Sequence, residues 1–229
     1  MSESSFPPPS LMVLSLLHEL VSGTFWASVG ATLQGWGYGL LIAAALGIAA
    51  GMAVGGSPLA YQAFRMPIEF LRPIPSVALI PLAILLYGIT LTSKLFLVVF
   101  AAFWPIFIQS LYGTRDVDHV AVDTARCLGL PRRARVRYVL LPSILPYVVT
   151  GLRISSAVAL ILSVTAELVI GVPGLGQQIT IARDGGDVRS MYALIIATGA
   201  LGWALNVVFA AGERRVLHWH PSQRQRGGQ

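Results

Sequence analysis

Long stretches of this chain carry no formal charge, and these stretches decide what it can fold into. Four such runs occupy residues 20–64, 73–93, 95–114 and 190–212. A helix needs roughly 20 predominantly apolar residues to cross a bilayer, and only helices or closed barrels satisfy their backbone groups inside lipid. The runs are continuous, whereas barrel strands alternate apolar and polar side chains. The sequence therefore predicts an all-α, polytopic membrane protein.

The composition agrees with this interpretation. Hydrophobic residues make up 55% of the chain and charged residues only 11%, whereas a typical soluble domain carries about 25% charged residues. The net charge of +6 fits basic loops between spans better than binding of nucleic acid. We expect spans at about residues 29–54, 73–89, 93–112, 146–170 and 191–211.

Glycine and proline mark features within these spans. Gly47, Gly51 and Gly55 recur every four residues, a spacing that lets helices approach closely, and we favour packing within the chain over a seam between two copies. Prolines interrupt residues 66–81 and remove backbone donors, which predicts a broken helix entering the membrane. Punctuation at a span end explains those prolines equally well. Residues 11–21 are too short to span and predict an amphipathic surface helix.

Positive charges are distributed unevenly between the expected loops. If the spans alternate, one side of the membrane receives only Lys94, Arg183 and Arg189, and the other side receives the rest of the 16 lysines and arginines. Cytoplasmic loops carry the excess of positive charge. We therefore expect the loop before residue 146 and the C-terminus to be cytoplasmic and the N-terminus to lie outside. The single cysteine, Cys127, falls in that loop and is expected to be a free thiol.

The same loop contains a run of helix signals. Asp118 is suited to cap a helix over about residues 119–128, and Gly129 to the left-handed conformation that ends it. Leu130 and Pro131 then begin a second, basic helix, in which the missing proline N–H is tolerated. We expect an apolar face of Val136, Val139 and Leu140 and a basic face of Arg133 and Arg137. The pattern predicts a rigid helical elbow on which a partner docks, rather than an ordinary basic loop.

Residues 123–142 resemble the EAA loop of ABC-importer permeases. In that pattern E-A-A is followed after three residues by G, after nine more by I, and then by one residue and L-P. The residues at these positions are Asp123, Thr124, Ala125, Gly129, Val139, Leu141 and Pro142. The substitutions at 123, 124 and 139 are conservative. The resemblance implies a coupling helix seated in a groove of an ATPase subunit, with coupling contacts from Asp123, Thr124, Ala125, Gly129, Leu130, Arg133, Leu141 and Pro142.

The resemblance extends to the nitrate/sulfonate/taurine type of these permeases over nearly the whole chain. It implies the type I ABC-importer transmembrane domain with about five spans visible. Such permeases usually carry six, and the start of this chain resembles the extracellular segment that follows their first span, so either the start is late or the protein is a true five-span version. The supporting segments are residues 71–89, 103–118, 141–154, 166–169, 174–176 and 213–221.

The expected spans and loops divide the chain into three regions. Residues 1–28 form an extracytoplasmic segment with a short amphipathic helix. Residues 29–212 form the permease domain, with the coupling loop at 116–142, and residues 213–229 form a cytoplasmic basic tail. In that tail, the neighbouring histidines 218 and 220 with the tryptophan between them predict an interfacial segment rather than a metal site.

Glu167 is the one acid inside an expected span, and such groups are functional candidates by default. On a continuous helix it lies roughly 21 Å from Arg153, too far to pair, so we expect it to bond backbone or Arg183. We favour a polar contact that stabilises a gate over plain structural polarity, and both over contact with substrate or protons. The resemblance implies that residues 171–186 form an extracellular gate. The gate or pathway candidates are Glu167, Gly174, Gly176, Pro75 and Pro81.

No arrangement of nucleophile, metal ligands or nucleotide-binding residues is found in the sequence; residues 171–186 are glycine-rich but lack the Gly-Lys-Ser/Thr of a phosphate loop. We expect no catalytic residue, metal or cofactor in this chain. The resemblance implies a permease homodimer in the bacterial inner membrane, two ATPase subunits that bind ATP and Mg²⁺, and an extracytoplasmic binding protein.

Two other functions remain open, a secondary transporter and a membrane scaffold or assembly protein. A secondary transporter is expected to show inverted repeats and more intramembrane charges. A scaffold has no need of an elbow that matches an ATPase groove. For an importer, the relatives imply a small solute such as a sulfonate, taurine, nitrate or bicarbonate, or alternatively a thiamine-precursor pyrimidine.

Overall fold

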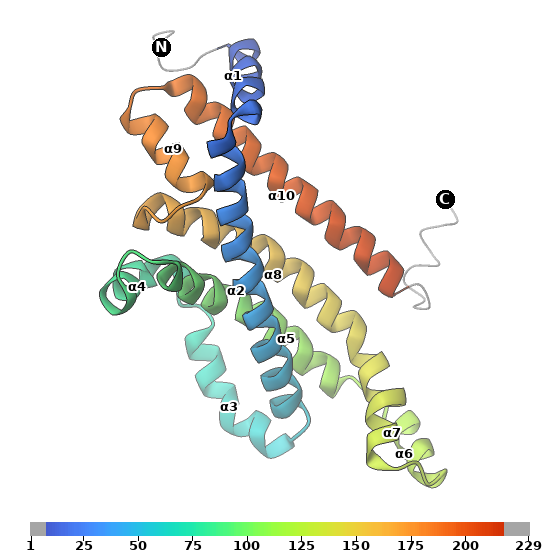
Figure 1. The fold of residues 1–229 in the computed structure, drawn as a ribbon. Helices are drawn as coiled ribbons and strands as arrows, with labels where there is room; N and C mark the ends of the chain where they lie inside the picture. Colours follow the sequence, from blue (N-terminus) through green and yellow to red (C-terminus); the bar gives the residue numbers. More distant parts are fainter. Residues whose placement is uncertain (1–7, 218–229) are drawn as a thin grey trace. The chain divides into compact units, whose positions relative to one another are not determined.

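The computed structural model describes residues 8–217, and within that range every regular element is helical. Figure 1 shows the order of the helices along the chain. The elements are α1 (Pro9–Val21), α2 (Gly23–Gly55), α3 (Pro58–Leu71), the 3₁₀ turn η1 (Ser76–Leu79), α4 (Ile80–Tyr87), α5 (Leu91–Arg115), α6 (His119–Cys127), α7 (Arg132–Arg135), the π-helical η2 (Val136–Leu140), α8 (Leu141–Ile170), α9 (Leu175–Asp184) and α10 (Val188–Val216).

Four helical runs of the described residues are long and apolar enough to cross a bilayer. They are α2, α5, α10 and the continuous run Arg132–Ile170, which joins α7, η2 and α8. A fifth is counted if α3 and the following η1–α4 segment form one span, although they meet at an angle of 81°. The predicted all-α fold with about five spans is confirmed.

The second expected span differs from its prediction. Residues 73–89 do not form one helix, because α3 ends at Leu71 and α4 has only 8 residues, about 12 Å of helix. Pro75 precedes η1 and Pro81 lies in the first turn of α4, where proline is tolerated because its missing N–H has no partner there. The broken helix expected over residues 66–81 is therefore present, with its break between Arg72 and Pro75.

The chain forms two compact units. Of the described residues, unit 1 comprises 8–41, 75–101 and 156–207, and unit 2 comprises 42–74, 102–155 and 208–217. The boundaries fall inside the four longest helices, so each unit takes one part of α2, α5, α8 and α10.

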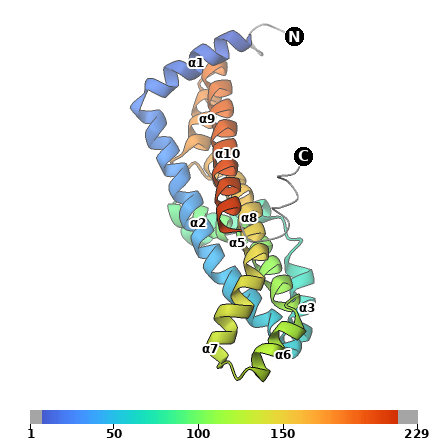
Figure 2. The same ribbon diagram turned by 90° about the vertical axis from the view of Figure 1, so that its right-hand side faces the viewer.

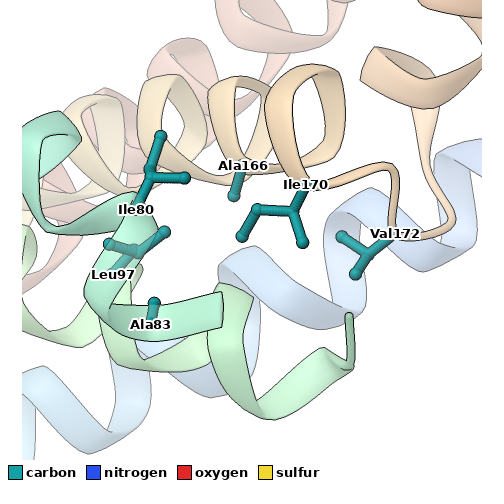
Figure 3. Close-up of a cluster of buried hydrophobic side chains, with 6 residues drawn as sticks. All are labelled: Ile80, Ala83, Leu97, Ala166, Ile170 and Val172. Atoms are coloured by element: carbon teal, nitrogen blue, oxygen red, sulfur yellow. The ribbon is translucent and has the colours of Figure 1, made fainter. Parts of the chain in front are cut away.

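Unit 1 contains two groups of buried apolar side chains. In the first, Ile80 and Ala83 of α4 and Leu97 of α5 point toward Ala166 and Ile170 of α8 (Figure 3). In the second, Phe25 of α2 packs with residues of α9 and α10, namely Leu175, Ile179, Leu194 and Ala197. These contacts tie the short helices α4 and α9 to the long ones.

Unit 2 is built on close approach of α2 and α5. A Cβ placed on Gly51 would lie 2.6 Å from the carbonyl oxygen of Phe107 in α5, and one on Gly55 would lie 2.8 Å from that of Leu111. Gly47 faces Ile106 in the same way. The preferred interpretation of the glycine spacing, packing within the chain, is confirmed.

The expected terminal segments are described only in part. A short helix is present as predicted, since α1 spans Pro9–Val21. At the other end α10 continues to Val216, several residues beyond the predicted span. Residues 1–7 of the N-terminal segment and residues 218–229 of the basic tail lie outside the described range, and with them the two tail histidines.

Candidate functional site

The predicted elbow is present in unit 2. The Asp118 carboxylate accepts a 2.8 Å hydrogen bond from the Val120 N–H and caps α6. Gly129 has a φ of +72° and follows the end of the helix. The Leu130 N–H then donates to the Ala125 carbonyl at 3.1 Å, which is the backbone closure of a Schellman motif. A Cβ at Gly129 would meet nothing within 4 Å, so backbone conformation rather than space favours glycine here.

The second arm of the elbow differs in detail from its prediction. Pro131 precedes the single turn α7, which passes directly into η2 and α8 (Figures 1 and 2). Hydrogen bonds in a π-helix join residues five apart, and the Leu141 N–H bonds the Val136 carbonyl in this way. The wider turn shifts the helical register. Val139 and Leu140 pack inward as expected, but Val136 is exposed, so its predicted place on the apolar face is wrong.

The residues of the EAA-like pattern are mostly on the surface of the elbow. Asp123 forms a 2.9 Å ion pair with Arg126 one turn later. Ala125 is buried and turns toward the rest of the unit, where α6 contacts α7 and η2. Leu130 is half-buried. The exposed members of the predicted coupling set are Asp123, Thr124, Gly129, Arg133, Leu141 and Pro142, beside exposed Cys127 and Leu128.

A buried ion pair lies in unit 1. The Nζ atom of Lys94 in α5 is 2.5 Å from Oε1 of Glu167 in α8, and the two side chains are only 1% and 0% exposed. Lys94 also donates to the Ala31 carbonyl of α2 at 2.9 Å. Thr32 donates its hydroxyl to Glu167 Oε2 at 2.9 Å. The carboxylate therefore draws together side chains and backbone from three helices.

The same carboxylate caps a fourth helix. The Gly176 N–H, in the first turn of α9, donates to Glu167 Oε2 at 2.9 Å, and the Leu175 N–H donates to Thr32 Oγ1 at 2.9 Å. The N-cap residue Gly174 has no side chain to supply these bonds. First-turn N–H groups need an external acceptor, and a negative charge is favourable at a helix N-terminus. Glu167 and Thr32 therefore fix where α9 begins.

Two glycines make room for the carboxylate. Gly174 has a φ of +155°, and a Cβ there would overlap the Glu167 carboxyl group. A Cβ on Gly176 would overlap the Val164 carbonyl and lie 2.7 Å from the Glu167 Cβ. Glu167, Gly174 and Gly176 thus belong to one site, whereas Pro75 and Pro81 belong to the broken segment before and within α4.

Of the two partners expected for Glu167, backbone or Arg183, the backbone is the one found, through the Gly176 N–H. Arg183 instead pairs its Nε with the adjacent Asp184 at 2.9 Å on the surface. The expectation that Lys94 lies in an outer loop is wrong, because its side chain is buried. Arg153 is not a partner of Glu167, as predicted, and pairs instead with Glu213 at 3.1 Å. In the sequence, Lys94 and Glu167 stand out only as one cation and one acid, each flanked by long uncharged runs.

The part of the chain that the structure describes contains no group of three or more His, Cys, Asp or Glu side chains able to hold a metal ion. The arrangement in unit 1 holds charges in place, and the arrangement in unit 2 presents a capped, exposed helix. Both arrangements fix the positions of helices.

The family described as "Binding-protein-dependent transport system inner membrane component" matches residues 43–218. The chain is 32% identical to the taurine transport system permease protein TauC of Escherichia coli, over 93% of this chain and 80% of that protein. It is 29% identical to the putative aliphatic sulfonates transport permease protein SsuC of Bacillus subtilis, over 96% and 80%. It is 32% identical to the nitrate import permease protein NrtB of Leptolyngbya laminosa, over 85% and 70%.

Solved structures resemble the fold. One is a crystal structure of an amino acid ABC transporter with histidines, with a TM-score of 0.69 at 18% identity over 93% of this chain and 97% of that one. Another is an inward-facing conformation of the MetNI methionine ABC transporter, with a TM-score of 0.62 at 21% identity over 95% and 98%. At these identities the likeness is one of fold alone.

Proposed function

This chain belongs to the binding-protein-dependent transport system inner membrane components, the permease subunits of ABC importers, and we propose that it conducts a small anionic solute inward when partner ATPase subunits close. Its fold is the type I ABC-importer transmembrane domain predicted from the sequence. In the proposal, ATP and Mg²⁺ bind the partner, and this chain supplies the path and the mechanical connection.

The observation that carries the proposal is the elbow. Its first arm, α6, is capped at both ends and exposes polar and apolar side chains to a partner. Its second arm is continuous with α8 in the run Arg132–Ile170. A partner that displaces α6 therefore moves a helix that crosses the membrane. A solvated loop without caps and without this continuity would absorb the displacement.

The far part of that helix supports a gating role. Glu167 lies three residues before the end of α8 and holds the first turn of α9 through the Gly176 N–H. We propose that the Glu167 cluster sets the position of α9 at the extracellular gate and that movement of α8 changes it. Closure of the ATPases then shifts the population from an inward-facing to an outward-facing state.

We propose the assembly that this mechanism needs. Two copies of this chain enclose the path, two ATPase subunits bind the elbows at the cytoplasmic side, and a binding protein delivers the solute outside. The bilayer is the inner membrane named by the family. The solute class rests on the relatives, which are named for taurine, aliphatic sulfonates and nitrate; these ligands share a compact oxyanion group.

The test is reconstitution of the chain with its ATPase and binding protein in proteoliposomes. We expect uptake of labelled taurine, an alkanesulfonate or nitrate that requires both ATP and the binding protein. A thiamine-precursor pyrimidine, which lacks such an oxyanion group, serves as the comparison and is expected to remain outside. Uptake driven by an ion gradient without ATP, or recovery of the chain without any ATPase subunit under mild solubilisation, would contradict the proposal.

A further inference from the structure

Unit 2 contains a basic groove that the proposed transport mechanism does not use. The groove has a volume of about 460 Å³ and lies between α3 and the last turns of α5. Arg65 and Arg72 line it together with Glu69, and two tyrosines, Tyr61 and Tyr112, form its walls. We propose that this groove binds the headgroup of an anionic phospholipid.

The charge of the groove favours an anion. Arg65 forms a 3.1 Å ion pair with Glu69, which neutralises one positive charge. Arg72 is exposed and forms no ion pair with any described residue. Arg115 does not line the groove, but its guanidinium stacks 3.8 Å from the centre of the ring of Tyr61, which does. The positive charges therefore exceed the single carboxylate.

The position of the groove favours a lipid over a soluble anion. Tyr112 lies in the last turn of α5, a 25-residue helix that is long and apolar enough to cross the bilayer and ends at Arg115. Tyrosine is enriched where such helices leave the membrane. Ile68 and Leu111 add apolar surface beneath the polar rim. A basic rim above an apolar floor at the end of a span matches the headgroup and glycerol region of a phospholipid, and cytoplasmic basic pockets between helices bind anionic lipids.

The geometry of α3 explains why these residues share the groove. Tyr61, Arg65 and Glu69 are four residues apart, and Ile68 and Arg72 are also four apart, so all five lie along one face of the helix. Proline at position 73 ends the backbone hydrogen bonding just after Arg72. Arg72, the C-cap residue of α3, is therefore the last residue of this face, and it lines the groove.

The test measures lipid binding to the purified full chain by native mass spectrometry, with phosphatidylglycerol, phosphatidylcholine and inorganic phosphate as probes. We expect saturable binding of phosphatidylglycerol, and binding weaker by about tenfold or more in the double variant Arg65→Gln/Arg72→Gln, since each basic residue near an anionic surface contributes measurably. The matched control is Arg183→Gln/Arg189→Gln, which removes two exposed arginines elsewhere and is expected to bind like the unmodified chain.

A gain-of-function variant keeps the test decisive if the double variant folds poorly. Glu69→Gln removes the carboxylate that competes for Arg65, so we expect it to bind phosphatidylglycerol more tightly than the unmodified chain. The conservative double variant Arg65→Lys/Arg72→Lys, which keeps both positive charges, is expected to retain part of the binding. Equal binding of phosphatidylglycerol and phosphatidylcholine would overturn the proposal. So would unchanged binding by the double variant, or displacement of the lipid by millimolar inorganic phosphate, which would assign the groove to a free anion.

Discussion

The ion pair between Lys94 and Glu167 places two charges where neither reaches water. Its main effect is to fix the positions of the helices that it joins. A buried pair is often no more stabilising than apolar residues of the same volume, but loss of one partner leaves an uncompensated charge. Here the carboxylate also accepts N–H and hydroxyl donors from α9 and α2. The pair therefore makes the position of α9 depend on α8 and α5.

The substitution Lys94→Met is expected to lower the free energy of unfolding by about 3–5 kcal/mol, because Glu167 stays buried without its counter-ion. The double variant Lys94→Met/Glu167→Gln should lose less than the sum of the two single variants. Thermal unfolding of the detergent-solubilised chain provides the measurement. The control is Arg183→Met, whose pair with Asp184 is exposed and should contribute at most about 1 kcal/mol. Equal effects of Lys94→Met and Arg183→Met would contradict the role assigned to burial.

Glu167 could be predicted from the sequence and its partner could not, for a physical reason. An acid in an apolar run has to be satisfied inside the protein, whatever the fold. Lys94 follows Ser93 at the edge of an uncharged run, where a lysine in a solvated loop gives the same pattern. Only the packing of α5 against α2 and α8 buries it, and the partners lie 73 residues apart in the chain.

At the scale of single elements, the elbow was predictable because each of its signals is local. The N-cap, the glycine stop and the following proline act through neighbouring backbone groups. The π-helical η2 was missed because residues 136–140 fit an ordinary helix equally well. Val139 and Leu140 of this element pack against the rest of unit 2, a tertiary contact that the local pattern does not reveal. The break after α3 was visible as prolines, but its 81° angle is a tertiary property.

The substitution Gly129→Val is expected to distort the elbow, because a φ of +72° costs a non-glycine residue about 1–2 kcal/mol and a β-branched residue fits it worst. ATP-driven uptake by the reconstituted importer should fall, together with co-purification of the ATPase subunit. Gly129→Asn is the matched control, since asparagine tolerates this conformation and the site has open space. Unchanged uptake by Gly129→Val would show that the elbow does not couple the two subunits.

The close packing of α2 on α5 gives a second prediction at the scale of single helices. Gly51→Ala should lower the melting temperature, because its Cβ would lie 2.6 Å from the Phe107 carbonyl oxygen and the helices must separate. Gly37→Ala lies in the same helix, where a Cβ meets nothing within 4 Å; it should be neutral or stabilising by up to about 1 kcal/mol. Scanning fluorimetry of both variants tests the difference. A similar melting temperature for the two would argue against close approach as the reason for glycine at position 51.

At the scale of the whole molecule, the all-α membrane class followed from the uncharged runs, since a bilayer leaves few alternatives to apolar helices. The span expected at residues 146–170 contains Arg153 and Glu167 and was recognised from its apolar majority instead. The division into two compact units did not follow in this way, because its boundaries fall inside continuous helices such as α2 and α8. No composition change marks a boundary of that kind. Orientation in the membrane depends on a third property, the distribution of arginine and lysine between the loops.

Orientation can be measured with the chain's own cysteine. Cys127 is the single cysteine in the sequence and is exposed at the end of α6. If the elbow is cytoplasmic, a membrane-impermeant maleimide should label Cys127 in inverted membrane vesicles and leave it unlabelled in intact cells. The reciprocal control is Asp184→Cys in a Cys127→Ser background, where the exposed end of α9 should be labelled from outside.

The same thiol distinguishes orientation from coupling. In the assembled importer the ATPase subunit should cover α6, so labelling of Cys127 in inverted vesicles should slow when the ATPase subunit is present and recover when it is stripped away. Labelling in intact cells would reverse the orientation and remove the elbow from the side where ATP is available. Labelling from the cytoplasmic side at a rate independent of the ATPase would keep the orientation and move the docking surface away from α6. The two labelling experiments therefore test two inferences separately. One is the membrane orientation, which was inferred from the distribution of positive charge over the whole chain. The other is the docking role of α6, which was inferred from the helix caps of one loop.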